Sequence, residues 1–577
     1  MTHRGSNLFV AAGLATLGLM TNAKADLTFD PIVYQGESPT IRLEVVGSYR
    51  GDLYNGSSST EPAAYDPLTR RLFGIKQLGP DFSPRGVVVL DISDPSTPIE
   101  EFFIDVTDIA PSGPFLASFV AVKNGVLAVA VENGDEAARG KVAFYSTSDF
   151  RLLADPVEVG VQPSGAVFTR DGRRLVVVST GEATDDVDPP ASVSVIDIRR
   201  GGDRLVTSVR TDDLSSFNDR GEELVESGVR IFASSASVAQ DLELDSIALS
   251  PNSRFAYATL LPNNAFAVID IRNARVIDIL PFGSKDYIEP GNKIDASDED
   301  DAINIRNWPI KALYQPDLLA AYRTFGRTLL VTPNEGAERG DDQRVEDLIL
   351  DENVFPDPEV LKEEKNLGRL SVTTAQLKGQ IGNENQADPD GDGLVNELFA
   401  FGARSFSIWT TDGRSIFDSG DDFEQITAAA IPDFFNTEDN NNEFDSRSDA
   451  RGPEPEALAV GSIGLRQYVF VTLEQMGGVM VYDITDPHDP SFQVYINNRN
   501  FLTDPPLSSD DDVCPEDTLF SDLPSPVCAE AGDLGPEGIM FIPRSKSPID
   551  APLVVVTQEI SDTTTLYRID RVKPGRE

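Results

Sequence analysis

Histidine and cysteine are almost absent from this sequence, which has two of each among its 577 residues. His3 lies in an N-terminal segment that we expect to be removed, and His488 lies in the turn-like segment DPHDP. Zinc sites with nitrogen or sulfur ligands need several such side chains, and Ser-His-Asp or Cys-His catalysis needs a histidine beside the nucleophile. The sequence therefore excludes zinc and these nucleophilic systems, and catalysis would have to use carboxylates, arginine and hard metal ions.

Positive charge is also scarce: the formal net charge is −47 and the pI is about 4.3. A surface of this sign repels the phosphates of nucleic acids and anionic membranes. The sequence contains no phosphate-binding G-x-x-x-x-G-K-S/T loop. We therefore expect no nucleic-acid partner and no nucleotide cofactor.

Long hydrophobic runs are missing after the first residues. The apolar run Leu8–Met20 is too short to span a bilayer, follows Arg4 and precedes the cleavage pattern Ala23-Lys24-Ala25. Residues 1–25 are therefore predicted to be a signal peptide, with cleavage near Ala25. No later run approaches 18 apolar residues, and the C-terminal RVKPGRE is polar. We expect a protein without a membrane span that is released outside the cell or into the periplasm.

The two cysteines, Cys514 and Cys528, lie in one stretch rich in proline and aspartate. Export favours oxidation, so we predict a disulfide bond between them. In the chain-entropy model, closing a loop of this length contributes about 3 kcal/mol to stability.

One short phrase recurs along the chain and predicts the fold. It reads VVVLDISDP at 87–95 and VMVYDITDP at 479–487, and looser copies bring the total to seven, which begin at residues 87, 142, 193, 266, 406, 479 and 565. Two further apolar runs precede each copy and another follows it, so that each repeat contains four apolar runs. Four short antiparallel strands, repeated with few helical patterns between them, are typical of a β-propeller. We therefore predict an all-β, seven-bladed β-propeller.

Two details of this propeller follow from segments outside the repeats. Ile41–Tyr49 precedes the first repeat, and we predict that it pairs beside the last strand, near Leu566, and closes the ring. An eighth blade, built partly from 367–374 and 397–402, is the alternative, but these segments lack an innermost strand.

Long insertions interrupt a single predicted domain that spans residues 26–577. They fall at about 283–315, 334–404, 420–454 and 500–535, with a shorter one at 218–244. All of them join the second strand of a blade to its third, or the fourth to the next blade, so we expect them on one face. Elaborated loops over a rigid scaffold are where binding and catalysis usually occur.

Carboxylates recur on that same predicted face. They stand where first strands begin or second strands end, and the candidates at the mouth of the channel are Asp245, Asp317, Glu335, Glu456 and Glu537. A ring of like charges is costly unless a cation neutralises it. A divalent cation or cationic ligand is one solution. Pairing with arginines in or beside the insertions is the other, and the candidates are Arg306, Arg404, Arg447 and Arg499.

A sharper metal pattern lies within the longest insertion. The segment DPDGDGL places three carboxylates at alternate positions, followed by a glycine and a backbone carbonyl, and the predicted ligands are Asp388, Asp390, Asp392, Leu394 and Glu397. Calcium takes six to eight oxygen ligands, and this spacing supplies them. Position 12 of an EF-hand loop is not acidic here, so we predict a structural calcium site of another type. The acid-rich segment 295–301 lacks such spacing and is interpreted as a solvated loop.

Several phrases resemble the choice-of-anchor I family, whose members are often labelled alkaline phosphatase or mesenchyme-specific cell surface glycoprotein. The matching stretches are 295–317, 331–342, 397–409, 444–458, 477–487 and 533–541. The resemblance implies a propeller of the YVTN/WD40-like type and a protein that is located at the cell surface or secreted. The chain departs from the family pattern in having Ala337 where an acid is expected, and we expect it to have no C-terminal anchoring segment.

Two classes of function remain open from the sequence. The first is an extracellular binding or interaction module, with Ca²⁺ or another hard divalent cation and an unidentified ligand. The second is a secreted metal-dependent hydrolase, of phosphoesterase or lactonase type, with a cation held at the channel mouth. The fold does not choose between them, because propellers serve both functions.

Overall fold

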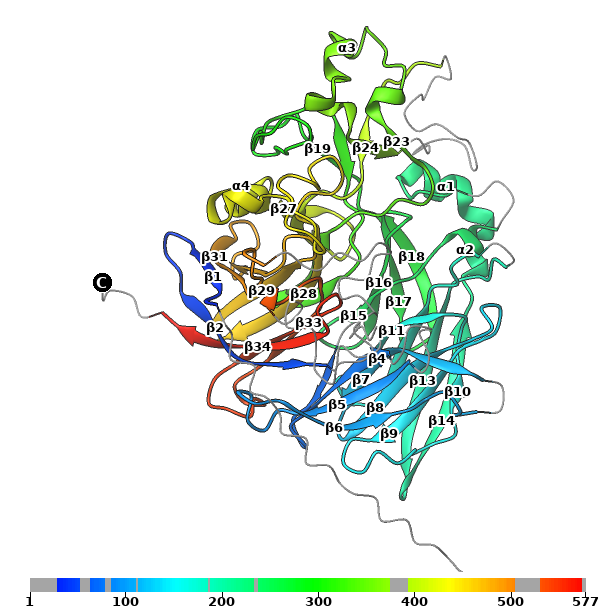
Figure 1. Cartoon of the computed structure of the whole chain (residues 1–577). Coiled ribbons are helices and arrows are strands. Elements are labelled where there is room, and N and C mark those ends of the chain that lie inside the picture. The colour runs from blue at the N-terminus through cyan, green and yellow to red at the C-terminus, as the bar shows by residue number, and fades with distance from the viewer. Residues whose placement is uncertain are drawn as a thin grey trace, which may run out of the picture.

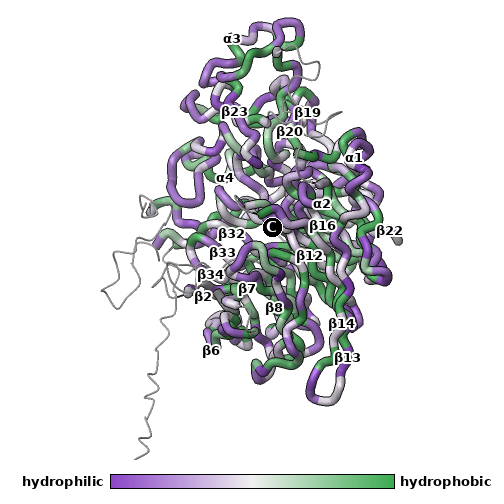
Figure 2. The backbone as a smooth tube through the Cα atoms, turned by 90° about the vertical axis from the view of Figure 1, so that its right-hand side faces the viewer, coloured by the Kyte–Doolittle hydropathy of each residue, from purple (hydrophilic) through white to green (hydrophobic). Residues whose placement is uncertain are grey.

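The computed structural model describes residues 29–51, 63–77, 85–110, 113–184, 187–232, 237–373, 393–503 and 530–572. Within them the chain is all-β, with many small antiparallel sheets and a few short helices (Figure 1). Hydrophobic segments follow the strands, whereas the connecting loops are mostly hydrophilic (Figure 2). None of the described helices is both long and apolar enough to cross a membrane.

Seven sheets share one strand order, and we number them along the chain. The first contains β3 (Ala64–Asp66), β4 (Arg71–Gln77), β5 (Arg85–Asp91) and β6 (Ile99–Ile104). The second contains β7 (Phe115–Lys123), β8 (Val126–Asn133), β9 (Lys141–Ser146) and β10 (Val157–Glu158). The third contains β11 (Pro163–Phe168), β12 (Arg174–Ser179), β13 (Ser192–Gly201) and β14 (Arg204–Asp212). The fourth contains β15 (Ile247–Leu249), β16 (Phe255–Leu260), β17 (Ala265–Asp270) and β18 (Arg275–Pro281).

The remaining three sheets of this type use more distant segments. The fifth contains β21 (Ala320–Thr324), β22 (Arg327–Asn334), β26 (Ser405–Thr410) and β27 (Ser415–Asp418). The sixth contains β28 (Pro455–Ile463), β29 (Arg466–Leu473), β30 (Val479–Asp483), β31 (Ser491–Asn497) and the added strand β1 (Ile32–Gln35). The seventh contains β32 (Pro536–Ile542), β33 (Leu553–Gln558), β34 (Thr563–Arg571) and β2 (Ile41–Arg50).

Alternate residues of one strand belong to different hydrophobic clusters, because side chains alternate between the two faces of a sheet. In β5, Val87 and Val89 pack toward the second sheet, whereas Val88 and Leu90 pack toward the seventh. All four side chains are at most 4% exposed. Burial on both faces explains why the strands read as continuous apolar runs rather than as an alternation of apolar and polar residues.

Clusters of this kind connect consecutive sheets along the chain, and one connects the two ends of the series. In that cluster Leu72 and Val88 of the first sheet pack with Val555 and Leu566 of the seventh. The seventh sheet is itself completed by β2, which pairs antiparallel with β34, and Gly47 lies opposite Leu566. The predicted pairing of the N-terminal segment beside the last strand is therefore confirmed.

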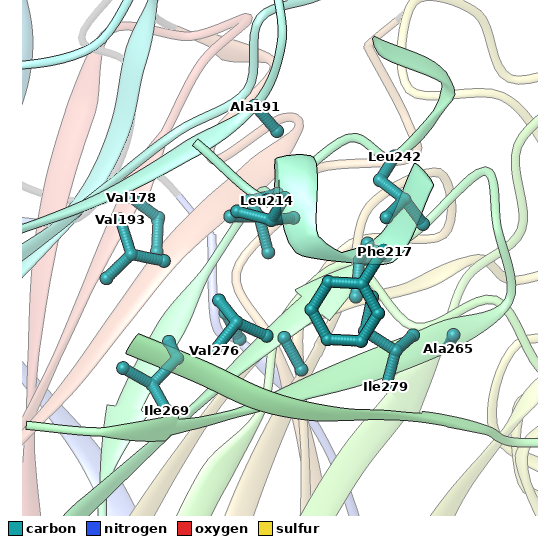
Figure 3. Close-up of a cluster of buried hydrophobic side chains, with 14 of the residues drawn as sticks. Val178, Ala191, Val193, Leu214, Phe217, Leu242, Ala265, Ile269, Val276 and Ile279 are labelled. Atoms are coloured by element: carbon teal, nitrogen blue, oxygen red, sulfur yellow. The ribbon is translucent and has the colours of Figure 1, made fainter. Parts of the chain in front are cut away.

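The predicted insertions leave the sheets at one end, where first strands begin and second strands end; we call this the insertion end. The helical elements in them are η2 (Ser215–Arg220), α1 (Gly221–Ser227), α2 (Val238–Asp241), η3 (Val345–Asp347), α3 (Pro358–Leu361), η4 (Glu364–Gly368), α4 (Asp422–Ala430) and η5 (Pro432–Phe434). Some insertions also extend the core. Phe217, Leu214 and Leu242 belong to the same buried cluster as Ile269 and Ile279 of the fourth sheet (Figure 3).

The eighth sheet differs from the other seven. Its strands are β19 (Ser284–Asp286), β20 (Lys311–Leu313), β25 (Phe399–Ala400), β24 (Ser371–Thr373) and β23 (Asp342–Arg344). They come from two insertions, include the parallel pair β20–β25, and form a layer with α3 at the top of Figure 1. The segments considered for an eighth blade therefore lie in this sheet, which lacks the strand order of the others.

The N-terminal strand β2 should contribute measurably to global stability. Leu43 is 6% exposed and packs with Tyr468, Val554 and Tyr567 in the cluster between the sixth and seventh sheets. We expect Leu43→Ala to lower the free energy of unfolding by about 3 kcal/mol, because the substitution leaves a cavity. Arg42→Ala is the matched control, since that side chain is 57% exposed. Denaturant unfolding measures both, and equal effects of the two variants would contradict the assignment.

Candidate functional site

Three of the predicted carboxylates meet at the insertion end of the fifth and sixth sheets. Asp317 precedes β21, Glu335 follows β22, and Glu456 is the second residue of β28. The beginning of β21 and the end of β22 lie at the same edge, because the two strands are antiparallel. One carboxylate oxygen from each of the three residues lies within 4.8 Å of the others. The strand arrangement thus gathers these side chains from well-separated parts of the sequence.

A second group overlaps the first. Glu335, Glu454 and Glu474 also place carboxylate oxygens within 4.8 Å of one another. Glu454 precedes β28 and Glu474 follows β29, so both come from the sixth sheet. We call the five residues Asp317, Glu335, Glu454, Glu456 and Glu474 the carboxylate centre.

Burial disfavours the ionised forms of Asp317, Glu335 and Glu456, and repulsion by neighbouring carboxylates adds to this effect for the two glutamates. The pKa of Glu335 lies well above its ordinary value because of burial and then because of Asp317. Burial, followed by the charges of Glu335 and Glu537, raises the pKa of Glu456 in the same way. Burial raises the pKa of Asp317 to about 6. Without a compensating cation, the centre therefore holds protons at pH values where isolated carboxyl groups have lost them.

The remaining two predicted acids adjoin this centre. Asp245 precedes β15, and the pKa of its carboxyl is raised by burial and then by Asp317. Glu537, in β32, is one of the charges that raise the pKa of Glu456. The five carboxylates predicted for the channel mouth are therefore close enough to influence one another in a chain from the fourth sheet to the seventh.

Sequence reasoning missed the arginine that matters most here, Arg451. Its guanidinium lies 3.1 Å from the Glu335 carboxylate and 2.7 Å from that of Glu454. Arg447 lies 2.7 Å from the other oxygen of Glu454, which is fully buried. Of the four arginines proposed from the sequence, Arg447 is the one that reaches the carboxylate centre. Arg451 lies in the same stretch, 444–458, but no spacing rule distinguished it from its neighbours.

The other three proposed arginines have structural roles. Arg404 forms a buried ion pair of 2.6 Å with Glu424 in α4. Arg499 donates to backbone carbonyls of two loops, and burial lowers its pKa to about 10. Arg306 stacks on Trp308 with its guanidinium carbon 3.7 Å from the ring centre. These contacts fasten the insertions rather than neutralise the predicted carboxylates.

Two carboxylate oxygens in the centre have no hydrogen-bond partner within the described part of the chain. Oε1 of Glu454 still lies 2.7 Å from the Arg451 guanidinium, whereas Oε2 of Glu456, a residue only 7% exposed, lies in no ion pair among the described residues. Buried polar atoms are nearly always satisfied by protein, water or an ion. Two guanidinium groups face five carboxyls, and both contact Glu454 rather than Glu456 or Asp317. The centre therefore offers oxygen ligands, the type that hard divalent cations prefer.

A second acidic cluster includes the segment interpreted as a solvated loop. Asp295 is 1% exposed, and burial and the charge of Glu424 raise its pKa to about 7. Burial and the charge of Asp295 raise the pKa of Asp445 to about 8. The backbone N–H of Asp295 donates to Glu424 of α4, and Ala296 belongs to the same buried cluster as Ala312 of the eighth sheet, so the beginning of this segment is buried and not solvated.

Other predictions concern segments outside the described residues. These are the signal peptide 1–25, the pair Cys514 and Cys528, and the loop acids Asp388, Asp390 and Asp392. Glu397, from the end of that loop, is described, and its carboxylate lies 2.7 Å from the Lys311 ammonium group. The calcium loop and the disulfide bond remain predictions.

A model of the choice-of-anchor I domain matches residues 61–487. The chain belongs to this family. The choice-of-anchor I stretches that the sequence suggested include 331–342 and 444–458, and these contain three members of the carboxylate centre as well as Arg447 and Arg451. The centre is thus built largely from segments that resemble the family.

Two curated proteins are similar to parts of this choice-of-anchor I chain. The mesenchyme-specific cell surface glycoprotein of Strongylocentrotus purpuratus is 31% identical over 282 residues, which are 43% of this chain and 35% of that protein. Gigasin-3a of Magallana gigas is 29% identical over 217 residues, which are 35% of this chain and 64% of that protein. The chain therefore spans about a third of one relative and less than two thirds of the other.

Comparison with solved structures gives matches of low similarity. A chain of Kuenenia stuttgartiensis hydrazine synthase gives a TM-score of 0.41 at 14% identity, and the match covers 90% of this chain and 97% of the hydrazine synthase chain. The WD40 domain of Toxoplasma gondii coronin gives a TM-score of 0.38 at 10% identity, and covers 95% and 90%.

Removing Arg451 should destabilise the protein, because the buried Glu454 and Glu335 lose a partner. We expect Arg451→Met to lower the free energy of unfolding by about 3 kcal/mol at neutral pH in cation-free buffer. The loss should shrink as the pH falls, because protonation of Glu335, whose pKa burial raises, removes a charge that Arg451 partners. Arg414→Met is the control, since its pair with Asp412 is 76% and 66% exposed and such pairs contribute less than about 1 kcal/mol.

The wild-type protein should show a related dependence on pH. A carboxyl whose pKa is raised by folding favours the folded state below its unfolded pKa of about 4, and that contribution is lost as the pH rises through the folded pKa. Because folding raises the pKa of Asp317 to about 6 and the pKa values of Glu335 and Glu456 well above their ordinary value, the cation-free protein should lose stability between about pH 4 and neutral pH. Denaturant unfolding across this range measures it, and stability that rises steadily to neutral pH would contradict this account of the centre.

Proposed function

We propose that the protein is an extracellular interaction module whose carboxylate centre holds Ca²⁺ or another hard divalent cation. The observation that carries the proposal is the meeting of Asp317, Glu335 and Glu456, with an unpartnered oxygen on the buried Glu456. A cation bound there would stabilise the ionised forms of these carboxyls and relieve their repulsion. Residues 26–577 would then form one domain, whose insertions surround the bound ion and build the surface that meets a ligand.

The scaffold that we propose is a seven-bladed β-propeller closed by the pairing of β2 with β34. Its support is the common strand order of the seven sheets and the cluster that joins the seventh sheet to the first. In a closed ring, the first strand of each blade faces a central channel. Residues at the beginnings of first strands, such as Asp317 and Glu456, would therefore converge at one mouth of the channel.

An extracellular location is supported from two directions. The family and its similarity to a cell surface glycoprotein suggest it, and the N-terminal sequence has the features of a signal peptide. We propose that the protein is secreted or periplasmic, and that a structural calcium ion orders the loop from Asp388 to Glu397. The hydrolase alternative is not proposed, because no feature of the described residues favours it over binding.

Calcium titration of the full-length mature protein tests the centre. We expect Ca²⁺ to raise the free energy of unfolding, by about 2.7 kcal/mol at a hundredfold excess over the dissociation constant. Glu456→Gln should be neutral or stabilising in EDTA, because it removes a repelled charge, and should lose Ca²⁺ affinity. Glu559→Gln is the control, since Glu559 follows β33 as Glu335 follows β22 but lies outside the carboxylate centre.

The design separates the two proposed calcium sites. Calcium binding that survives Glu456→Gln but disappears on further Asp390→Asn belongs to the loop in the insertion. Equal stability changes for Glu456→Gln with and without Ca²⁺ would remove the carboxylate centre as a cation site and leave pairing with Arg451 as its explanation.

The export proposal predicts that Cys514 and Cys528 are oxidised in the mature protein. Thiol labelling under denaturing conditions should detect no free thiol before reduction and two after it, and reduction should lower stability by up to about 3 kcal/mol. Labelling of both cysteines without reduction would reject the disulfide bond.

A further inference from the structure

A positively charged pocket lies at the end of the sheets opposite the insertion end. Its volume is about 1030 Å³, and it lies among the turns that connect β7 to β8, β11 to β12 and β15 to β16 and the strand residues beside the turn that connects β13 to β14. These turns follow first or third strands, whereas the carboxylate centre lies where first strands begin. The two features therefore occupy opposite ends of the strands.

The charge of the pocket is contrary to that of the protein. Its lining includes six cationic side chains and two carboxylates, and the cationic residues are Lys123, Arg170, Arg173, Arg174, Arg199 and Arg200. The carboxylates are Asp171 and Asp197. The pocket thus has an excess of four positive charges in a chain whose formal net charge is −47. Such a concentration focuses a positive potential in a concave site.

Most of these cations are not neutralised locally. Arg174 pairs with Asp197 at 2.7 Å, and Arg200 donates to the carbonyl of Asn124. No ion pair within 4.0 Å involves Lys123, Arg170, Arg173 or Arg199 across the part of the chain that the structure describes. The pKa of Lys123 is lowered by burial and then by the nearby charges of Lys546 and Arg170, so like charges are held close together.

The floor of the pocket is apolar. Val126, Phe168, Ile198 and Leu205 line it, are each 6–8% exposed, and belong to the cluster between the second and third sheets. Ligand pockets usually combine an apolar floor with a few polar groups that fix orientation. Here the floor suits the carbon body of a ligand, and the rim suits its charges.

We propose that this pocket binds a compact organic ligand that carries several sulfate or phosphate ester groups. Guanidinium groups bind sulfate and phosphate oxygens through two parallel hydrogen bonds. A ligand with several such groups is needed to balance four positive charges. A long polyanion is disfavoured, because beyond the pocket it would meet the acidic surface of the protein.

Titration calorimetry with the full-length protein tests the proposal, in buffer without added divalent cations because phosphate esters bind Ca²⁺. The probes are sucrose octasulfate and inositol hexakisphosphate, which separate the sulfate and phosphate forms of the ligand. A hyaluronan tetrasaccharide, which carries carboxylates alone, is the control ligand. We expect saturable binding of at least one ester probe, weakened by salt, and no comparable binding of the tetrasaccharide.

The variants locate the binding. The double variant Arg170→Gln with Arg173→Gln should lower the affinity for the probe by about tenfold or more, because charge-assisted hydrogen bonds are lost. Arg323→Gln with Arg327→Gln is the matched control, with the same charge change on exposed residues flanking the turn between β21 and β22. It should change affinity by less than about twofold. Absence of binding by both ester probes, or equal weakening by the two double variants, would overturn the proposal.

Discussion

Burial of both faces of each sheet is the constraint on which the rest of the structure depends. A sheet that is apolar on both sides needs a neighbour on each side. The first and seventh sheets meet this requirement by packing on each other through residues such as Val88 and Val555. The seventh sheet exists as a four-stranded unit because β2 joins it from the other end of the chain. Side chains at the strand ends are therefore held by the packing of their own sheet and of its neighbours.

This rigidity holds the carboxylates of the centre close together. Exposed acidic loops can move apart to reduce repulsion, but Glu456 is fixed at the beginning of β28 and Glu335 at the end of β22. Their carboxyls remain close although burial and repulsion raise both pKa values. Arg451 pairs with Glu335 and Glu454 and so offsets part of the free-energy cost of burying these carboxylates together. An oxygen of Glu456 remains without a hydrogen bond among the described residues, which is an arrangement that a bound cation would explain.

The sequence predicted those features that repeat and missed those that do not. The strands of the seven similar sheets, the pairing of β2 with β34 and the gathering of Asp317, Glu335 and Glu456 follow from apolar runs at equivalent positions. The eighth sheet was missed because its strands have two or three residues and pair across two insertions. Arg451 was missed because loop conformation, which has no periodic signal, brings it to Glu335. The positively charged pocket was missed because its side chains come from turns of different sheets.

The pairing of β2 with β34 also has a consequence for how the chain folds. Residues that contact each other there are more than 500 positions apart, as in the ion pair of Arg568 with Glu44, for which the separation is 524. Closing such a loop is entropically unfavourable before the intervening sheets have formed, and contacts of this range slow folding. The seventh sheet is therefore the last to be completed when the chain emerges with its N-terminus first. If such a chain crossed a membrane in extended form, β2 would cross first and would lack its partner β34 until translocation had finished, so the seventh sheet would be completed on the far side.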